Sequence, residues 1–275
     1  MYISRTFSKL SRVHQEVGIE VEVEGSNLPS QIPGWRTTSD GSLRGESHEY
    51  VLEHPVERSE VDKVLNALAL AYKKRKTVVN DSDRAGIHVH VNMQDYTITK
   101  TFNTIILYLL FEDIYSHYCG PSREGNLFCL RIRDAEYLLE LLETSVATNN
   151  FDILNTDDIR YASINLKALA VYGSLEFRTL RGTADTKRIA NWVDMLLLLK
   201  DRAMMFDNPL TILDKLSEEG TGPFAHRILG EYAPSLLVCP DWEASIEASA
   251  SRLQLVALAG NWTELNFCDE PCCDC

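Results

Sequence analysis

Apolar and polar residues alternate with a period of two in several short stretches of the chain, which is the pattern of a strand with one buried face. The stretches that follow this pattern are residues 17–24, 49–53, 87–92, 161–167 and 175–180. We therefore predict five strands, all within the first two thirds of the sequence.

Helical periodicity separates and follows these strands. Ser59 is predicted to be an N-cap, with Asp62 three residues later, and the helix that it opens runs to residue 72. The other predicted helices are residues 101–117, residues 134–147, a helix from 183 or 185 to about 205, and a helical region from 209 with breaks at 220–223 and Pro240. Strands mixed with helices, without regular βαβ alternation, indicate an α+β fold with a largely antiparallel sheet.

No internal repeat and no linker rich in Gly, Ser or Pro divides the chain. We predict a main domain over residues 1–206, a helical extension packed on it over 207–266, and a disordered cysteine-rich tail over 267–275. An odd number of cysteines without an export signal indicates reduced thiols. A soft-metal site in the tail is the less favoured interpretation.

Side chains on a strand alternate between its two faces, so the parity of the residue number tells which side chains share a face. Four of the predicted strands combine an apolar face with a face rich in Glu, His, Asn and Arg. The polar members are Glu20, Glu22, Glu24, His88, His90, Asn92, Tyr161, Ser163, Asn165, Glu176 and Arg178.

Each strand alone has an ordinary explanation, such as the solvated face of an edge strand or a weak exposed ion pair. A solvated face, however, would mix Lys and Thr among its acids, whereas these strands gather metal ligands and an arginine suited to phosphate. Crowded carboxylates also repel one another unless a cation compensates them. The set therefore predicts a phosphoryl-transfer site with two Mg²⁺ ions. Neither a P-loop nor a GxGxxG sequence occurs, so the nucleotide would be held in another way.

The composition limits the kinds of molecule that the chain can be expected to bind. The chain has 275 residues, of which 45% are hydrophobic and 24% charged, as in ordinary globular proteins. A formal net charge of −13 argues against a nucleic-acid partner. No apolar run reaches the roughly 18 residues of a membrane span, and the N-terminus lacks the apolar core of a signal peptide. We expect a cytoplasmic location and no membrane partner.

Several motifs follow one another in a fixed order between residues 17 and 192. They are Gly18-Ile19-Glu20-Val21-Glu22, Trp35, Asp40-Gly41-Ser42-Leu43 leading to Glu49, Gly86-Ile87-His88-Val89-His90-Val91, Arg123 with Asn126 and Cys129, Ile164-Asn165-Leu166, Leu175-Glu176-Phe177-Arg178, and Gly182-Thr183. In this order and spacing the chain resembles the amidoligases of phages and fungi, members of the glutamine synthetase and glutamate–cysteine ligase superfamily. A phage origin would place the protein in the host cytoplasm.

The resemblance implies a curved antiparallel sheet with helices on its convex face, and with ATP and two or three Mg²⁺ ions, or Mn²⁺, on its concave face. It implies metal ligation by Glu20, Glu22, Glu49, His88 and Glu176, with Glu53 as the alternative to Glu49. Arg178 would neutralise the transferred phosphoryl group, and Asp40 would either bind metal or accept a proton from the amine. The implied nucleotide contacts are Arg123, Asn126, His90, Asn165 and Arg181.

The implied reaction is the ATP-dependent formation of an amide from a small or peptide carboxylate and an amine, through an acyl phosphate. Peptidoglycan precursors, amino acids and side chains of a partner protein all remain open as substrates, and so does the oligomeric state. Three rival functions are a phosphotransferase on the same fold, a metal-dependent hydrolase that uses His88 and His90, and a non-catalytic nucleotide-binding module.

Overall fold

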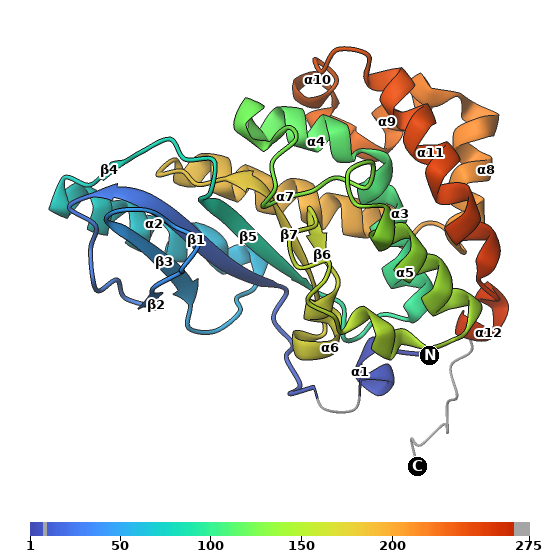
Figure 1. The fold of residues 1–275 in the computed structure, drawn as a ribbon, viewed down its shortest axis with the longest axis horizontal. Helices are drawn as coiled ribbons and strands as arrows, with labels where there is room; N and C mark the ends of the chain where they lie inside the picture. The colour runs from blue at the N-terminus through green and yellow to red at the C-terminus, as the bar shows by residue number, and fades with distance from the viewer. Residues whose placement is uncertain (8–9, 267–275) are drawn as a thin grey trace.

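The computed structural model describes residues 1–7 and 10–266. Its centre is an open seven-stranded sheet in the order β2-β3-β1-β5-β7-β6, with β4 beside β1 (Figure 1). The strands are β1 (Val17–Ser26), β2 (Trp35–Thr38), β3 (Ser47–Leu52), β4 (Val78–Val79), β5 (Gly86–Asn92), β6 (Ile164–Asn165) and β7 (Ser174–Arg181). Every pairing between these strands is antiparallel. The predicted α+β class with an antiparallel sheet is confirmed.

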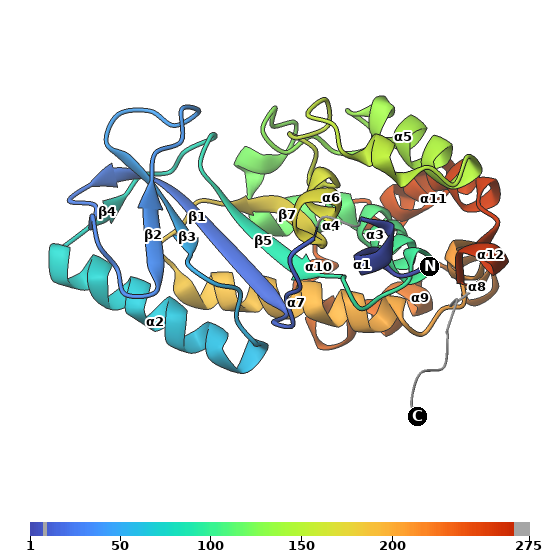
Figure 2. The same cartoon turned by 90° about the horizontal axis from the view of Figure 1, so that it is seen from below.

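One face of the sheet is apolar and is covered by two long helices, α2 (Arg58–Arg75) and α7 (Thr186–Ala203) (Figure 2). The odd-numbered residues of β1 from Val17 to Val23 are buried. Full burial of such a side chain contributes roughly 1.5–3 kcal/mol. This face therefore anchors the sheet, and the even-numbered face is left for polar side chains.

Helix α2 begins at Arg58 with Glu57 as its N-cap, so the prediction of Ser59 as the N-cap is wrong. A tertiary contact outweighs the local capping signal here. The Arg58 guanidinium donates a 2.8 Å hydrogen bond to Asp194 of α7. The first turn of α2 is thereby fixed to the second helix beneath the sheet.

The remaining helices gather beside the sheet (Figure 1). They are α1 (Ile3–Thr6), α3 (Ile98–Leu110), α4 (Glu112–Cys119), α5 (Glu136–Ala147), α6 (Lys167–Tyr172), α8 (Pro209–Glu219), α9 (Thr221–Leu229), α10 (Ala233–Leu236), α11 (Trp242–Ala259), α12 (Trp262–Asn266) and three 3₁₀ turns at Pro121–Arg123, Phe151–Leu154 and Gly230–Tyr232. Helix α3 is buried along almost its whole length, and α7, α8, α11 and α12 pack against it. The apolar core runs from the sheet into these helices without a break.

The predicted helix over residues 101–117 is two helices, α3 and α4, which meet at Phe111. Phe111 departs from helical geometry, with φ −102° and ψ 8°. The charged pair Glu112-Asp113 follows Phe111, but Ile114 and Tyr115 continue the helical spacing, so the periodicity gave no sign of the break. The break allows Glu112 to begin a new helix with its side chain buried.

The predicted strand over residues 161–167 is reduced to the two residues of β6, and α6 follows at once. Gly173 ends α6 in the left-handed region, with φ +73°. A Cβ at this position would lie 2.4 Å from Cγ of Gln94, so only glycine fits. The tight turn at Gly173 directs the chain into β7.

Strand β7 contains a bulge opposite β5. Between two cross-strand pairs β7 has one residue more than β5; the pairs are Ile87↔Leu180 and Val89↔Phe177. A bulge re-aims the side chains beyond it. Leu180 thus returns to the apolar face, although strict alternation would place it with Glu176 and Arg178.

Among the helices in the described part of the chain, none has the length and apolarity required to cross a bilayer. The predicted cysteine-rich tail, residues 267–275, lies outside the described residues.

Candidate active site

Polar side chains from five strands meet on the face of the sheet that α2 and α7 do not cover. The cross-strand pairs that bring them together are Glu22↔Glu49, Glu20↔His88, His90↔Glu176 and Asn165↔Glu176. Directly paired residues have Cβ atoms about 4.5–5.5 Å apart. The antiparallel register therefore joins residues that are distant in sequence into one site.

Glu20, His88 and Glu176 form what we term the central cluster, in which one ligand atom of each lies within 4.8 Å of the others. His88 Nδ1 lies 3.2 Å from Glu20 Oε2 and 3.6 Å from Glu176 Oε1. The Asn165 amide donates to Glu176 Oε2 at 2.7 Å, and Arg178 donates to the other carboxylate oxygen. The atoms of this cluster that could bind a metal thus contact neighbouring side chains on the same face.

The two carboxyl groups of the central cluster have lowered pKa values, although Glu176 is buried and Glu20 is largely so. Burial opposes ionisation of Glu20, but hydrogen bonds from His88 and His90 outweigh it and hold its pKa well below the ordinary value. Burial also opposes ionisation of Glu176, and the charges of His90 and Arg178 more than compensate, so its pKa is lowered. Both groups are available as metal ligands at neutral pH.

Glu22, Asp40 and Glu49 form a second group, the outer cluster, again with ligand atoms within 4.8 Å of one another. The Gly86 N–H donates to Glu22 at 2.8 Å. A Cβ at Gly86 would lie 3.1 Å from His88 Nε2, so this glycine allows the two clusters to approach each other closely.

The outer cluster carries unbalanced negative charge. Burial, followed by the charges of Glu20 and Glu22, raises the pKa of Glu49 to about 7. Burial opposes ionisation of Asp40, but hydrogen bonds from Ser42 prevail and lower its pKa. A divalent cation would relieve this repulsion, and carboxylate oxygens are the ligands that Mg²⁺ prefers. Glu53 is exposed just beyond the end of β3, so Glu49 is the residue that joins the cluster.

His90 connects the central cluster with a neighbouring pocket. Its Nε2 lies 3.3 Å from Glu20 Oε1, and its Nδ1 lies 3.1 Å from Ser174 Oγ. The Tyr172 ring meets the imidazole edge-on at 5.5 Å. Burial opposes protonation, but the Glu20 hydrogen bond and the charge of Glu176 outweigh it, so the pKa of His90 is raised.

Arg123 is only 1% exposed, and a Cβ at Gly86 would lie 3.3 Å from its Nη2 and 3.1 Å from His88 Nε2, so its guanidinium lies near His88. Its Nε donates to the Thr179 carbonyl at 2.9 Å and its Nη2 to the Arg178 carbonyl at 2.6 Å. The main-chain N–H of Arg178 in turn donates to the Ser163 carbonyl at 2.8 Å. Arg123 therefore fixes the bulge in β7 and through it the direction of Arg178.

Two other predicted contacts lie at the outer end of the site. The Asn126 amide donates to the Asp83 carbonyl at 2.6 Å and to its own loop. Arg181 stands in register with Gly86 and pairs with Asp81 at 2.9 Å. Asn126 thus stabilises the loop at the rim of the site, whereas Arg181 lies on the polar face itself.

The prediction that Tyr161 and Ser163 share the polar face with Asn165 is wrong. Strand β6 has only two residues, so its alternation does not extend back to them. Ser163 instead donates its hydroxyl to the buried carboxylate of Glu112, and the Tyr161 hydroxyl bonds to Arg160.

The chain matches a family model described as "Putative amidoligase enzyme" over residues 20–199. This match covers more than half of the sequence and contains every predicted site residue. The chain belongs to this amidoligase family. Family membership supports an enzyme, in general terms a ligase. No curated protein matches the chain.

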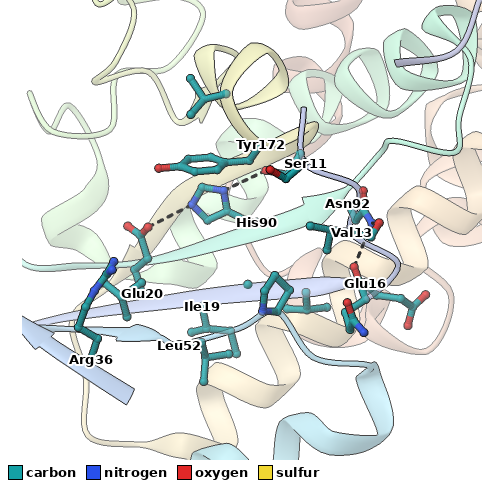
Figure 3. A pocket seen from close by; sticks show the side chains of 17 residues that line it. Ser11, Val13, Glu16, Ile19, Glu20, Arg36, Leu52, His90, Asn92 and Tyr172 are labelled. Carbon is teal, nitrogen blue, oxygen red and sulfur yellow. Dashed lines mark hydrogen bonds and ion pairs between the residues drawn. The ribbon is translucent and has the colours of Figure 1, made fainter. Parts of the chain in front are cut away.

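In this family member a pocket of about 410 Å³ adjoins the central cluster. Figure 3 shows Glu20 and His90 pointing toward each other at its edge, with Tyr172 beside the imidazole and Leu52 on another side. Its size falls within the range of roughly 300–1,000 Å³ that is usual for small-molecule sites. Glu20 and His90 belong to both the pocket and the site, so the two are continuous.

Sequence reasoning missed three residues around the site. Arg36 and Tyr172 line the pocket; Arg36 lies on the unpredicted strand β2, and Tyr172 precedes the helix-ending Gly173, which was a usable signal. Arg84 donates to the Ser42 carbonyl at 2.7 Å and lies 5.3 Å from the centre of the Phe128 ring. Arg84 shares the even parity of the two histidines that follow it, and this parity could have indicated its position.

Proposed function

We propose that the chain is an ATP- and Mg²⁺-dependent carboxylate–amine ligase that forms an amide through an acyl phosphate. The observation that carries the proposal is the pair of carboxylate clusters on one sheet face, with the Arg178 guanidinium close to both. We also assign the sheet to the glutamine-synthetase-like type, because an open antiparallel sheet with one helix-covered face and one acidic face has the required form.

The donor atoms of the two clusters fit magnesium. They are five carboxylates and one imidazole, and hard oxygen ligands of this kind suit Mg²⁺ or Mn²⁺ better than softer metals. We assign one ion to each cluster. Bound there, the ions would neutralise negative charge on the phosphate groups of ATP.

Arg178 is the residue that we assign to the transferred phosphoryl group. Its Nη1 is engaged by Glu176, whereas its Nε is buried and has no hydrogen-bond partner within the described part of the chain. A buried donor without a partner is costly. A phosphate oxygen would satisfy it, and the planar guanidinium can contact two such oxygens at once.

The reaction requires two substitutions. An oxygen of the substrate carboxylate attacks the γ-phosphorus, and the bond to the bridging oxygen of ADP breaks. The amine nitrogen then attacks the acyl carbon, inorganic phosphate leaves, and the nitrogen loses a proton. The closeness of Asp40 to Glu22 and Glu49 favours Asp40 as a metal ligand. Its lowered pKa keeps it ionised, which the alternative role of proton acceptor also requires.

The proposed nucleotide contacts divide into two groups. His90, Asn165 and Arg181 stand on the polar face, and we retain them as direct contacts. Arg123 and Asn126 act indirectly in this proposal, through the bulge and through the loop at the rim.

ADP release in the presence of Mg²⁺ and pools of carboxylic acids and amines tests the proposal, with mass spectrometry of the product. We expect ADP and an amide in equal amounts when both substrates are present, no amide when either is missing, and no ADP without the acid. The Glu20→Gln variant is the matched negative control.

Other results would select a rival function. A released acyl or guanidino phosphate without amide would indicate a phosphotransferase. Hydrolysis without ATP, with zinc bound stoichiometrically, would indicate a hydrolase. Nucleotide binding without turnover of any pool would indicate a binding module.

A further inference from the structure

The pocket beside the central cluster has apolar walls. Val51, Leu52 and Pro55 form one side, and Val171 and Tyr172 on α6 form another. Gly18 lies on its floor, in the row of even-numbered β1 residues that continues from Glu20, and a Cβ there would already be 3.3 Å from the Cβ of His90. Glycine therefore keeps the floor open where the neighbouring even positions carry glutamates.

The pocket differs in polarity from the opposite, outer end of the site. Among the described residues its lining is mostly apolar, and its charged or titratable members are Arg36, His90, Glu16 and Glu20. At the outer end lie the three carboxylates of the outer cluster, which the proposed metal ion would compensate, together with Arg84 and with Arg181, which pairs with Asp81. A triphosphate requires metal ions and cationic side chains, so it is better matched by the outer end than by this mostly apolar pocket.

From this asymmetry we propose that the pocket holds the acid substrate, and that this substrate is a carboxylic acid with an apolar body. The inference rests on the proposed ligase function. The apolar body lies between α6 and the end of β3. The carboxylate points toward the ion assigned to the central cluster, which would offset the repulsion from Glu20 and Glu176, and there it receives the phosphoryl group. The nucleotide approaches from the opposite side, past Arg84 and Arg181.

Val171→Trp tests the assignment because Val171 is 44% exposed on the pocket wall and belongs to neither cluster. Val238→Trp is the matched control, since Val238 is 66% exposed and does not line the pocket. We expect Val171→Trp to raise KM for the acid by about tenfold or more, while Kd for Mg-ATP and KM for the amine stay within about twofold of wild type. Val171→Ala should instead shift the preference toward bulkier acids.

Three outcomes would overturn the assignment. Weaker Mg-ATP binding with an unchanged KM for the acid would make the pocket a nucleoside site. A rise confined to KM for the amine would make it the amine site. Unchanged values for all three would show that no substrate enters it.

A direct binding experiment separates this inference from the ligase function. Saturation-transfer NMR with hexanoate, benzoate and N-acetyl-leucine, in the presence of Mg²⁺ and without ATP, needs no turnover. Binding of at least one of these acids to the wild type and to Val238→Trp, but not to Val171→Trp, would support the pocket assignment even if no amide is ever formed. Equal binding to all three proteins, or to none, would overturn it.

Discussion

Glu176 in the central cluster and Glu112 at the start of α4 are both almost inaccessible to solvent, with exposures of 6% and 2%. Burial opposes ionisation in each case, but the outcomes are opposite. The pKa of Glu176 is lowered, because the charges of His90 and Arg178 exceed the effect of burial. Burial raises the pKa of Glu112 to about 8, because its hydrogen bonds from Ser163 and Ile132 do not compensate.

The pKa values of Glu176 and Glu112 differ because of the groups that surround each carboxyl, and not because of how deeply each is buried. Glu112 accepts a 2.8 Å hydrogen bond from the Ile132 N–H, and the nearby Arg131 is already paired with Asp113 at 2.8 Å. A buried carboxylate stays ionised only where a cationic group shares its surroundings. The polar sheet face supplies such groups to Glu20 and Glu176, which favours their ionised form, whereas the raised pKa of Glu112 favours its neutral form.

The largest effect is expected when the ionised acids are neutralised. Glu20→Gln and Glu176→Gln should each reduce ATP-dependent turnover by on the order of a thousandfold or more, because each removes charge that faces metal and phosphate. The fold should persist, since both side chains serve the polar face and not the core, but melting temperatures should fall because each variant leaves a buried cationic neighbour without its carboxylate. Steady-state ADP release and thermal melting measure the two effects.

Glu24→Gln is the control for these variants. Glu24 follows the same parity on β1 but belongs to neither cluster. It should retain nearly normal turnover. Normal turnover by Glu20→Gln or Glu176→Gln would remove that residue from the site.

Arg178→Lys tests whether the cation that lowers the pKa of Glu176 also serves the reaction. We expect kcat to fall by about a hundredfold, with a smaller change in KM for ATP, because an ammonium cannot reproduce the planar fork of the guanidinium. Arg181→Lys should mainly raise KM. A wild-type kcat with only a higher KM in Arg178→Lys would mean that Arg178 holds the nucleotide and does no more.

The addition of Mg²⁺ should have a smaller effect, on the stability of the fold. Glu49 is crowded by Glu20 and Glu22, so binding of Mg²⁺ should relieve repulsion in the folded protein. A ligand that binds only the folded state stabilises it by about 2.7 kcal/mol at a hundredfold excess over its Kd. The melting temperature should rise with Mg²⁺ and return with a chelator. Glu49→Gln should melt higher without metal and respond less to Mg²⁺, whereas Glu53→Gln should behave as wild type. Equal responses in all three proteins would mean that Glu49 is not a ligand.

The acidic face could be predicted from sequence because strand alternation is a local property. The parity of β1, β5 and β7 was enough to place Glu20, His88 and Glu176 together, and their antiparallel pairing completed the central cluster. Asp40 and Glu49 came from the family resemblance, and the outer cluster brings them to Glu22.

Features that depend on tertiary contacts were not predictable in this way. The bulge in β7 rests on hydrogen bonds from Arg123, which is distant in sequence. The pocket needs α6, whose residues 168–172 follow the predicted strand 161–167 and had been assigned to no element. The buried state of Glu112 depends on the helix break at Phe111. The helical spacing of apolar residues resumes at Ile114, so periodicity does not report this break.

The smallest effect should appear in the pH dependence of stability, and it sharpens the contrast with Glu176. The folded-state pKa of Glu112, about 8, lies above its ordinary value of 4.5. Between these values the folded protein binds more protons than the unfolded chain, so the contribution of Glu112 is fully present below about pH 4.5 and is lost as the pH rises toward 8. From pH 6 to pH 7 this residue alone should lower the free energy of unfolding by up to about 1.4 kcal/mol.

In Glu112→Gln the amide mimics the neutral acid: its NH₂ can donate to Ser163 and its oxygen can accept from Ile132. Denaturant unfolding at both pH values should therefore show a smaller loss for Glu112→Gln than for wild type. Parallel pH profiles would mean that Glu112 is ionised in the folded protein, and the contrast with Glu176 would then have to be explained without protonation.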